Sequence, residues 1–86
     1  MVERIVKNAL KKGSAILGFK ESIKFLKINK AKLVIIAENM PEKMKKDINH
    51  LCKLSKTKIR VFEGTSRELG VVCGKPYPIS TIVIKG

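Results

Sequence analysis

The segment Lys32–Glu38, which reads KLVIIAE, places the strongest constraint on the fold. Its apolar residues follow one another without polar alternation and are rich in β-branched side chains, a pattern typical of a strand that is covered on both faces. Such a strand lies in the middle of a sheet. The rest of the chain must therefore supply a packing layer on each side of that sheet.

Helical and extended periods alternate along the chain. Apolar spacing predicts helices over Val2–Lys12, about Lys20–Asn29 and within Asn39–Ser55, and the capping-box residues Thr65 and Glu68 predict a fourth, short helix. The remaining strands are expected at Ser14–Leu17, at Lys58–Phe62 (where Lys58, Arg60 and Phe62 alternate with Ile59 and Val61) and at Ile79–Lys85. Four helix-then-strand units predict an α/β fold: a three-layer α/β/α sandwich with a four-stranded mixed sheet, formed by residues 1–86 as a single domain.

The chain is strongly basic. It has 19 Lys and Arg against 7 Asp and Glu, a net charge of +12, and nine of the basic residues with only two Glu fall in residues 1–32, a local net charge of +7. This charge exceeds what solubility requires and repels itself unless a polyanion screens it. Nucleic acid is therefore the expected partner, with its footprint centred in the first third of the chain.

The cysteines and the hydropathy of the chain indicate the cellular compartment in which the protein is expected. Cys52 and Cys73 are isolated and belong to no paired ligand motif, so we expect no metal, no cofactor and a reducing compartment. No signal peptide is visible, and no apolar run approaches the roughly 20 residues that a membrane span needs. We expect a soluble cytoplasmic protein that is a monomer when free.

Residue types suited to catalysis are scarce. His50 is the only histidine, and it falls in the middle of a predicted helix near Asp47, where a solvated surface pair explains both residues. Cys52 and Cys73 have no neighbouring base and are expected as small core residues. No glycine-rich nucleotide motif or serine elbow occurs, so an enzyme is not expected.

Two glycine-led strand-to-helix corners are the strongest functional feature. The first corner is Gly18–Lys24 (GFKESIK), and the second corner is Gly64–Gly70 (GTSRELG). Each begins a helix whose free amides and positive dipole end favour phosphate or base edges, and neighbouring parallel strands would place both corners at one edge of the sheet.

Side chains of the first corner suit RNA. Lys20 and Lys24 can reach phosphates or guanine acceptors, and Glu21 can accept from the amino and imino groups of an exposed base. An ordinary solvated Glu21–Lys24 pair is the alternative interpretation. Phe19 and Phe62 are candidates for stacking on bases, although burial is the default for both. With so few aromatic residues, a folded and kinked RNA suits the surface better than an extended strand.

Four stretches, in order, resemble the ribosomal protein L30e family, within the L7Ae-like superfamily of kink-turn RNA binders: LGFKESIKFLK, KLVIIAENMP, KDINHLCKLS and VFEGTSRELGVVCGKPYPIS. The resemblance covers nearly the whole chain. It implies an α/β/α sandwich that holds a sharply bent RNA with tandem sheared G·A pairs at its loop edge.

The resemblance also implies site residues. The first corner in this superfamily typically reads G-x-N-E-x-x-K; Gly18, Glu21 and Lys24 match it, while Lys20 stands where Asn is usual. Because lysine donates but cannot accept, charge would replace part of the base reading. The second corner matches the loop that lies against the bulged nucleotides, with Phe62 at a stacking position. The implied RNA-binding residues are Gly18, Phe19, Lys20, Glu21, Lys24, Phe62, Gly64, Thr65, Ser66, Arg67, Glu68 and Gly70.

The preferred hypothesis is a non-enzymatic, ribosome-associated protein of the large subunit, archaeal in type, that binds a kink-turn in ribosomal RNA and has other ribosomal proteins as possible neighbours. A stand-alone kink-turn adaptor of a guide-RNA particle or transcript is the first alternative. An RNA-modifying or hydrolytic enzyme is the second. A module that binds acidic proteins or membranes by charge alone is the third.

Overall fold

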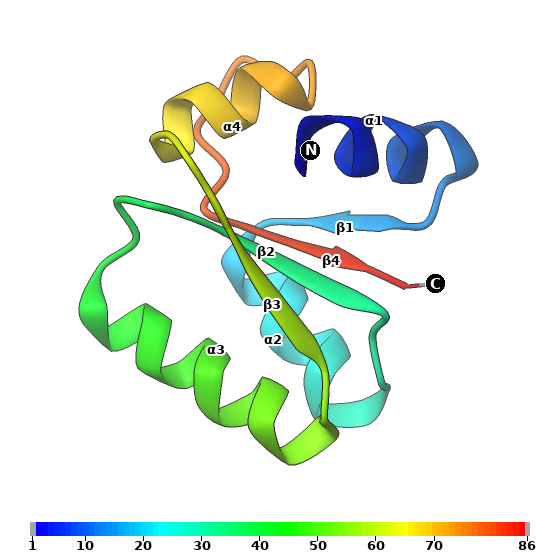
Figure 1. Cartoon of the computed structure of the whole chain (residues 1–86), viewed down its shortest axis with the longest axis vertical. Helices are drawn as coiled ribbons and strands as arrows, with labels where there is room; N and C mark the ends of the chain where they lie inside the picture. The colour runs from blue at the N-terminus through cyan, green and yellow to red at the C-terminus, as the bar shows by residue number, and fades with distance from the viewer. Residues whose placement is uncertain (1, 86) are drawn as a thin grey trace.

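The computed structural model describes residues 2–85, in which helices and strands alternate strictly (Figure 1). The helices are α1 (Val2–Lys12), α2 (Phe19–Ile28), α3 (Glu42–Ser55) and α4 (Ser66–Val72), and the strands are β1 (Ala15–Leu17), β2 (Leu33–Ala37), β3 (Lys58–Phe62) and β4 (Thr81–Ile84). The predicted sequence of four helix-then-strand units is confirmed.

The four strands form one mixed sheet in the order β1-β4-β2-β3. Strand β4 runs antiparallel to both β1 and β2, whereas β2 and β3 are parallel. Because β4 alone is reversed, β1, β2 and β3 all point the same way. Their carboxyl ends and the start of β4 therefore meet at one end of the sheet, which we call the loop end.

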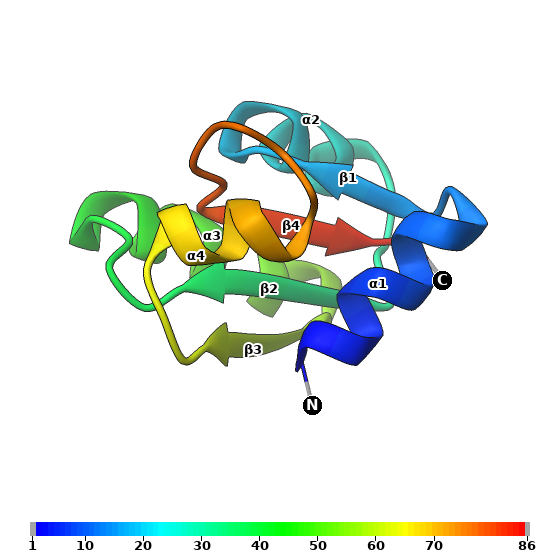
Figure 2. The ribbon, with the colours of Figure 1, turned by 90° about the horizontal axis from the view of Figure 1, so that it is seen from above.

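Helices cover both faces of the sheet, with α1 and α4 on one side and α2 and α3 on the other (Figures 1 and 2). All five residues of β2 are buried. Leu33, Ile35 and Ala37 pack with α1 and α4, while Val34 and Ile36 pack with α2 and α3. The unbroken apolar run thus supplies both cores, and the predicted three-layer α/β/α sandwich is confirmed.

Exposure along strand β3 does not follow side-chain polarity near the end of the strand. Phe62 is only 5% exposed, which agrees with burial as the default for this ring, whereas its neighbour Val61 is 51% exposed. Phe62 joins the core that α1 and α4 form with the sheet, and Val61 points to the opposite face at the open edge of the sheet. The two sets of side chains thus alternate between the faces as predicted, but the helices on each face decide which residues of β3 are covered.

Gly70 is buried within α4 and allows a close approach of the chain that follows. A Cβ atom at this position would overlap the backbone carbonyl oxygen of Tyr77. The α4–β4 loop, residues 74–80, can fold back onto α4 only because Gly70 has no side chain. It is then held there by a hydrogen bond from Ile79 N to Ser66 O of 2.9 Å.

Replacing Gly70 with Ala should therefore destabilise the protein. Alanine gains about 1 kcal/mol of helix propensity over glycine, but overpacking costs about 1–3 kcal/mol, and a backbone obstacle cannot rotate away. We expect urea denaturation to show a net loss of about 2 kcal/mol. Val71→Ala, at an exposed neighbouring position, should change stability by less than about 0.5 kcal/mol. A Gly70→Ala protein as stable as the wild type would contradict this account.

Candidate nucleic-acid interface

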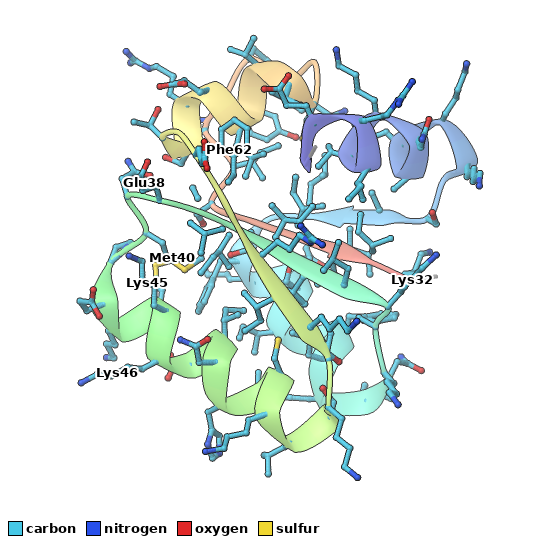
Figure 3. All side chains as sticks on the ribbon, in the orientation of Figure 1. Lys32, Glu38, Met40, Lys45, Lys46 and Phe62 are labelled. Carbon is cyan, nitrogen blue, oxygen red and sulfur yellow. The ribbon has the colours of Figure 1, made fainter. Side chains whose placement is uncertain are left out.

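Backbone hydrogen bonds join the connections at the loop end. Gly18 N donates to Thr81 O at 2.9 Å, which ties the first corner to β4, and Glu38 N donates to Gly64 O at 3.0 Å, which ties the end of β2 to the second corner. Figure 3 shows Glu38 and Phe62 at this end and Lys32 at the other end of β2. The loop end is thus a connected surface rather than a set of independent loops.

The two corners share the loop end but are not neighbours. Strands β1 and β3, which lead into them, are the two outer strands of the sheet, with β4 and β2 between them. Three inter-strand spacings of about 4.8 Å put the corners roughly 14 Å apart. Both corners open at one end of the sheet, as expected for parallel strands, although these two strands are not neighbours because β4 and β2 lie between them.

The first corner turns from strand to helix within one residue. Gly18 has φ 103° and ψ 151°, a conformation open essentially to glycine alone. Among the described residues no side chain caps α2 at this point. The first amide of α2 with an acceptor in its own helix is that of Ser22, which donates to Gly18 O. The amides of Phe19, Lys20 and Glu21 have no such acceptor, so they point outward from the positive end of the helix dipole.

Three charged side chains surround these amides. Lys20, Glu21 and Lys24 are all exposed. Within residues 2–85 the one ion pair is between Lys45 and Glu42, at 3.9 Å, so Glu21 and Lys24 do not form the surface pair considered as an alternative. The carboxylate and both ammonium groups are therefore exposed and form no ion pair within residues 2–85.

The second corner is capped from within the protein. Asn39 Oδ1 accepts from Ser66 N at 2.8 Å, and Thr65 Oγ1 accepts from Glu68 N at 3.3 Å. Two of the first amides of α4, expected to be available to RNA, are therefore already bonded. The Thr65 half of the predicted capping box is confirmed, but Asn39, which lies 27 positions from Ser66, is a cap that no local motif reveals.

Neither phenylalanine considered for stacking on bases is well exposed, whereas a tyrosine that was not considered is. Phe62 is buried and Phe19 is half-buried against the α2–α3 core, whereas Tyr77 is 53% exposed. Tyr77 belongs to the α4–β4 loop, which leads into β4 at the loop end (Figure 2). The backbone of this loop at Tyr77 lies against Gly70. Sequence reasoning overlooked Tyr77, because only the position of this loop singles it out.

The other predicted site residues lie around the second corner in different environments. Thr65, Arg67 and Glu68 are exposed, and Gly64 and Ser66 are half-buried. Gly70 is buried beneath the α4–β4 loop, which makes packing against Tyr77 its evident role. Arg67 is the one cation in this set.

Groups suited to other chemistry are poorly placed. Burial raises the pKa of the Cys52 thiol to about 11. Burial also raises the pKa of Cys73, an effect that the charge of Lys75 partly opposes. Among residues 2–85, no three His, Cys, Asp or Glu side chains gather as a metal site requires, and none of the helices is long and apolar enough to cross a membrane.

The Asn39 cap can be tested by substitution. Asn39→Ala should lower the free energy of unfolding by about 1 kcal/mol and speed hydrogen exchange of the Ser66 amide, because that donor loses its acceptor. Asn39→Asp keeps an acceptor oxygen next to the start of α4 and should retain most of the stability. Equal stability and equal Ser66 exchange in the Asn39→Ala protein would show that the bond does not hold the corner.

Over nearly its whole length, the chain is similar in sequence to ribosomal proteins of archaea. The chain is 44% identical over 84 residues to the large ribosomal subunit protein eL30 of Methanothermobacter thermautotrophicus, covering 98% of this chain and 86% of that protein. It is 43% identical over 79 residues to eL30 of Saccharolobus solfataricus, covering 92% and 73%.

Solved structures share the fold. A Giardia lamblia 15.5 kD RNA-binding protein matches with a TM-score of 0.87 and 23% identity over 99% of this chain and 71% of that one. A Bacillus halodurans protein of unknown function matches with a TM-score of 0.86 and 19% identity, covering 98% of this chain and 83% of that one.

A family model described as ribosomal protein L7Ae/L30e/S12e/Gadd45 matches residues 1–86. The resemblance read from the sequence is thus confirmed, and the chain belongs to the ribosomal protein L7Ae/L30e/S12e/Gadd45 family.

Proposed function

We propose that this chain is a non-enzymatic RNA-binding protein of the large ribosomal subunit and that its loop end recognises a kink-turn with tandem G·A pairs. The observation that carries the proposal is the uncapped start of α2, where three outward amides lie beside the exposed side chains of Lys20, Glu21 and Lys24. The names of the eL30 relatives and of the RNA-binding structural neighbour support the assignment to ribosomal RNA.

The chemistry of the first corner suits guanines in sheared G·A pairs. A sheared pair leaves the pairing edge of its guanine accessible, with donors at N1 and N2 and an acceptor at O6. Glu21 can accept from both donors, while an α2 amide or an ammonium group donates to O6. An unkinked duplex keeps this edge inside Watson–Crick pairs, so the same groups would distinguish RNA shape.

The rest of the loop end fits a bent rather than a straight ligand. The second corner, roughly 14 Å across the sheet by strand spacing, offers Arg67 and the polar rim of Thr65 and Glu68 to the strand leaving the bend. On the α4–β4 loop, which leads into β4 at the loop end, Tyr77 offers an exposed ring for an unpaired base. Tyr77 takes the stacking role expected of Phe62, whose ring is in the core.

The proposed setting follows from the proposed ligand. A protein that binds ribosomal RNA within the large subunit is cytoplasmic and ribosome-associated, and its neighbours include other ribosomal proteins. Free in solution it is expected to be a monomer, because a net charge of +12 opposes self-association without a polyanion.

Glu21 provides the sharpest test of shape recognition. Binding is measured for a short kink-turn RNA and for the same RNA with its G·A pairs changed to Watson–Crick pairs. A bidentate base contact is worth about 1–3 kcal/mol, so Glu21→Ala should reduce the preference for the kink-turn by about ten- to a hundredfold. Asp47→Ala removes the same charge from an exposed position on α3 and should leave the preference unchanged.

Two results would count against the proposal. Wild-type protein that binds both RNAs equally, with affinities that fall together as salt rises, would reduce the interaction to charge alone. An intact preference in the Glu21→Ala protein would place base recognition somewhere other than the first corner.

A further inference from the structure

A second basic surface lies between α1 and the outer strand β3. Here α1 and the sheet edge enclose an open groove of about 1100 Å³, lined by Glu3, Arg4, Lys7, Asn8 and residues 60–63. We call it the α1–β3 groove. Figures 1 and 2 show β3 at the outer edge of the sheet and α1 on the same side of the sheet as α4.

Three cations converge on this groove from two elements. Arg4 and Lys7 are three positions apart on α1 and so share a helical face. Arg60 lies two positions before Phe62, whose ring packs in the core with α1, so alternation places Arg60 on the same face of the sheet. The side chains of all three are exposed.

Cations outnumber carboxylates in this groove by three to two. Glu3 and Glu63 also line the groove, yet over residues 2–85 neither carboxylate lies within ion-pair distance of a cation there. The lining therefore keeps a net positive charge, and among residues 2–85 none of its three cations is held in an ion pair. The groove therefore has the charge and size for a phosphate-bearing ligand.

Protection of the sheet edge explains only part of this arrangement. Charged side chains on an outer strand discourage pairing with another chain, which accounts for Lys58 and Arg60. It does not account for Arg4 and Lys7, which lie on a helix and face the groove.

We propose that the α1–β3 groove binds the phosphate backbone of an RNA stem that leaves the second corner. The groove ends at Phe62 and Glu63, directly before Gly64, so a stem passing the second corner continues along it. This inference rests on the proposed function, since it extends the same RNA along the edge of the protein. The contact is to the backbone, and so it adds affinity and orientation without reading sequence.

The test compares two protein variants on two RNAs. Arg4→Ala/Lys7→Ala/Arg60→Ala removes the groove cations, and Lys27→Ala/Lys30→Ala/Lys53→Ala removes three exposed cations near the carboxyl ends of α2 and α3, away from the loop end. One RNA is a kink-turn with short stems, and the other has the stem next to the second corner lengthened by one helical turn. Affinities are measured over a salt series, after urea denaturation shows that both variants are folded under the binding conditions.

Each phosphate contact contributes roughly 0.7–0.9 to the slope of log affinity against log salt. On the long-stem RNA, the groove variant should therefore lose about 2–3 in slope relative to the control variant. On the short-stem RNA the two variants should behave alike. Equal slopes on the long-stem RNA would overturn the proposal while leaving kink-turn recognition intact.

Two further arms separate this inference from the function on which it rests. If wild-type protein shows no kink-turn preference, the slope of log affinity against log salt is measured on a plain RNA duplex instead. A smaller slope for the groove variant than for the control variant supports phosphate binding in the groove, and equal slopes overturn it. NMR of the Arg4 and Arg60 Nε–H groups provides the second arm. Shifts with a glutamate-rich peptide but none with duplex RNA would assign the groove to an acidic protein and overturn the proposal.

Discussion

Strand β4 organises the whole structure, because it hydrogen-bonds to β1 on one side and to β2 on the other while running against both. Its reversal makes β1, β2 and β3 point the same way, so every strand-to-helix connection opens at the loop end. The residues where β4 begins also bond to that end directly: Thr81 O accepts from Gly18 N, and Ser80 O accepts from Ala37 N, each at 2.9 Å. The sheet pairing that closes the core is thus the same pairing that positions the candidate RNA-binding surface.

The two corners at the loop end look alike in sequence but differ in physical state. In the second corner, Asn39 and Thr65 occupy two of the first amides of α4, which fixes the corner and lowers its capacity for an outside acceptor. In the first corner, Gly18 has no side chain to offer, and the first amides of α2 face outward. The two corners therefore suit different roles in the proposed function: the first corner offers free amides for base recognition, and the second corner is held rigid by its caps.

Much of the fold could be predicted because its signals are local. The β-branched run of β2, the amphipathic period of the helices and the Thr65 cap each depend on residues close in sequence. The order of the strands depends on pairing between β1 and β4, more than 60 positions apart, for which no period gives evidence. The same limit explains why the Asn39 cap, the burial of Phe62 and the exposure of Tyr77 emerged only from the three-dimensional arrangement.

The site itself was predictable in its residue types but not in its accessibility. The resemblance singled out Gly18, Glu21 and Lys24, and the structure places the two charged side chains in solvent beside free amides. It also named Phe62 and Gly70, which the structure shows buried, because a sequence motif does not distinguish residues that support a loop from residues that it exposes.

The central claim is that the uncapped start of α2 is the surface that binds RNA. Its most direct test is the ¹⁵N–¹H NMR spectrum of the protein titrated with a kink-turn RNA, with hydrogen exchange measured for individual amides. The account predicts large shifts and slowed exchange at Phe19, Lys20 and Glu21, with much smaller changes at the capped amides of Ser66 and Glu68. Unchanged α2 amides, with shifts confined to scattered lysines, would contradict it.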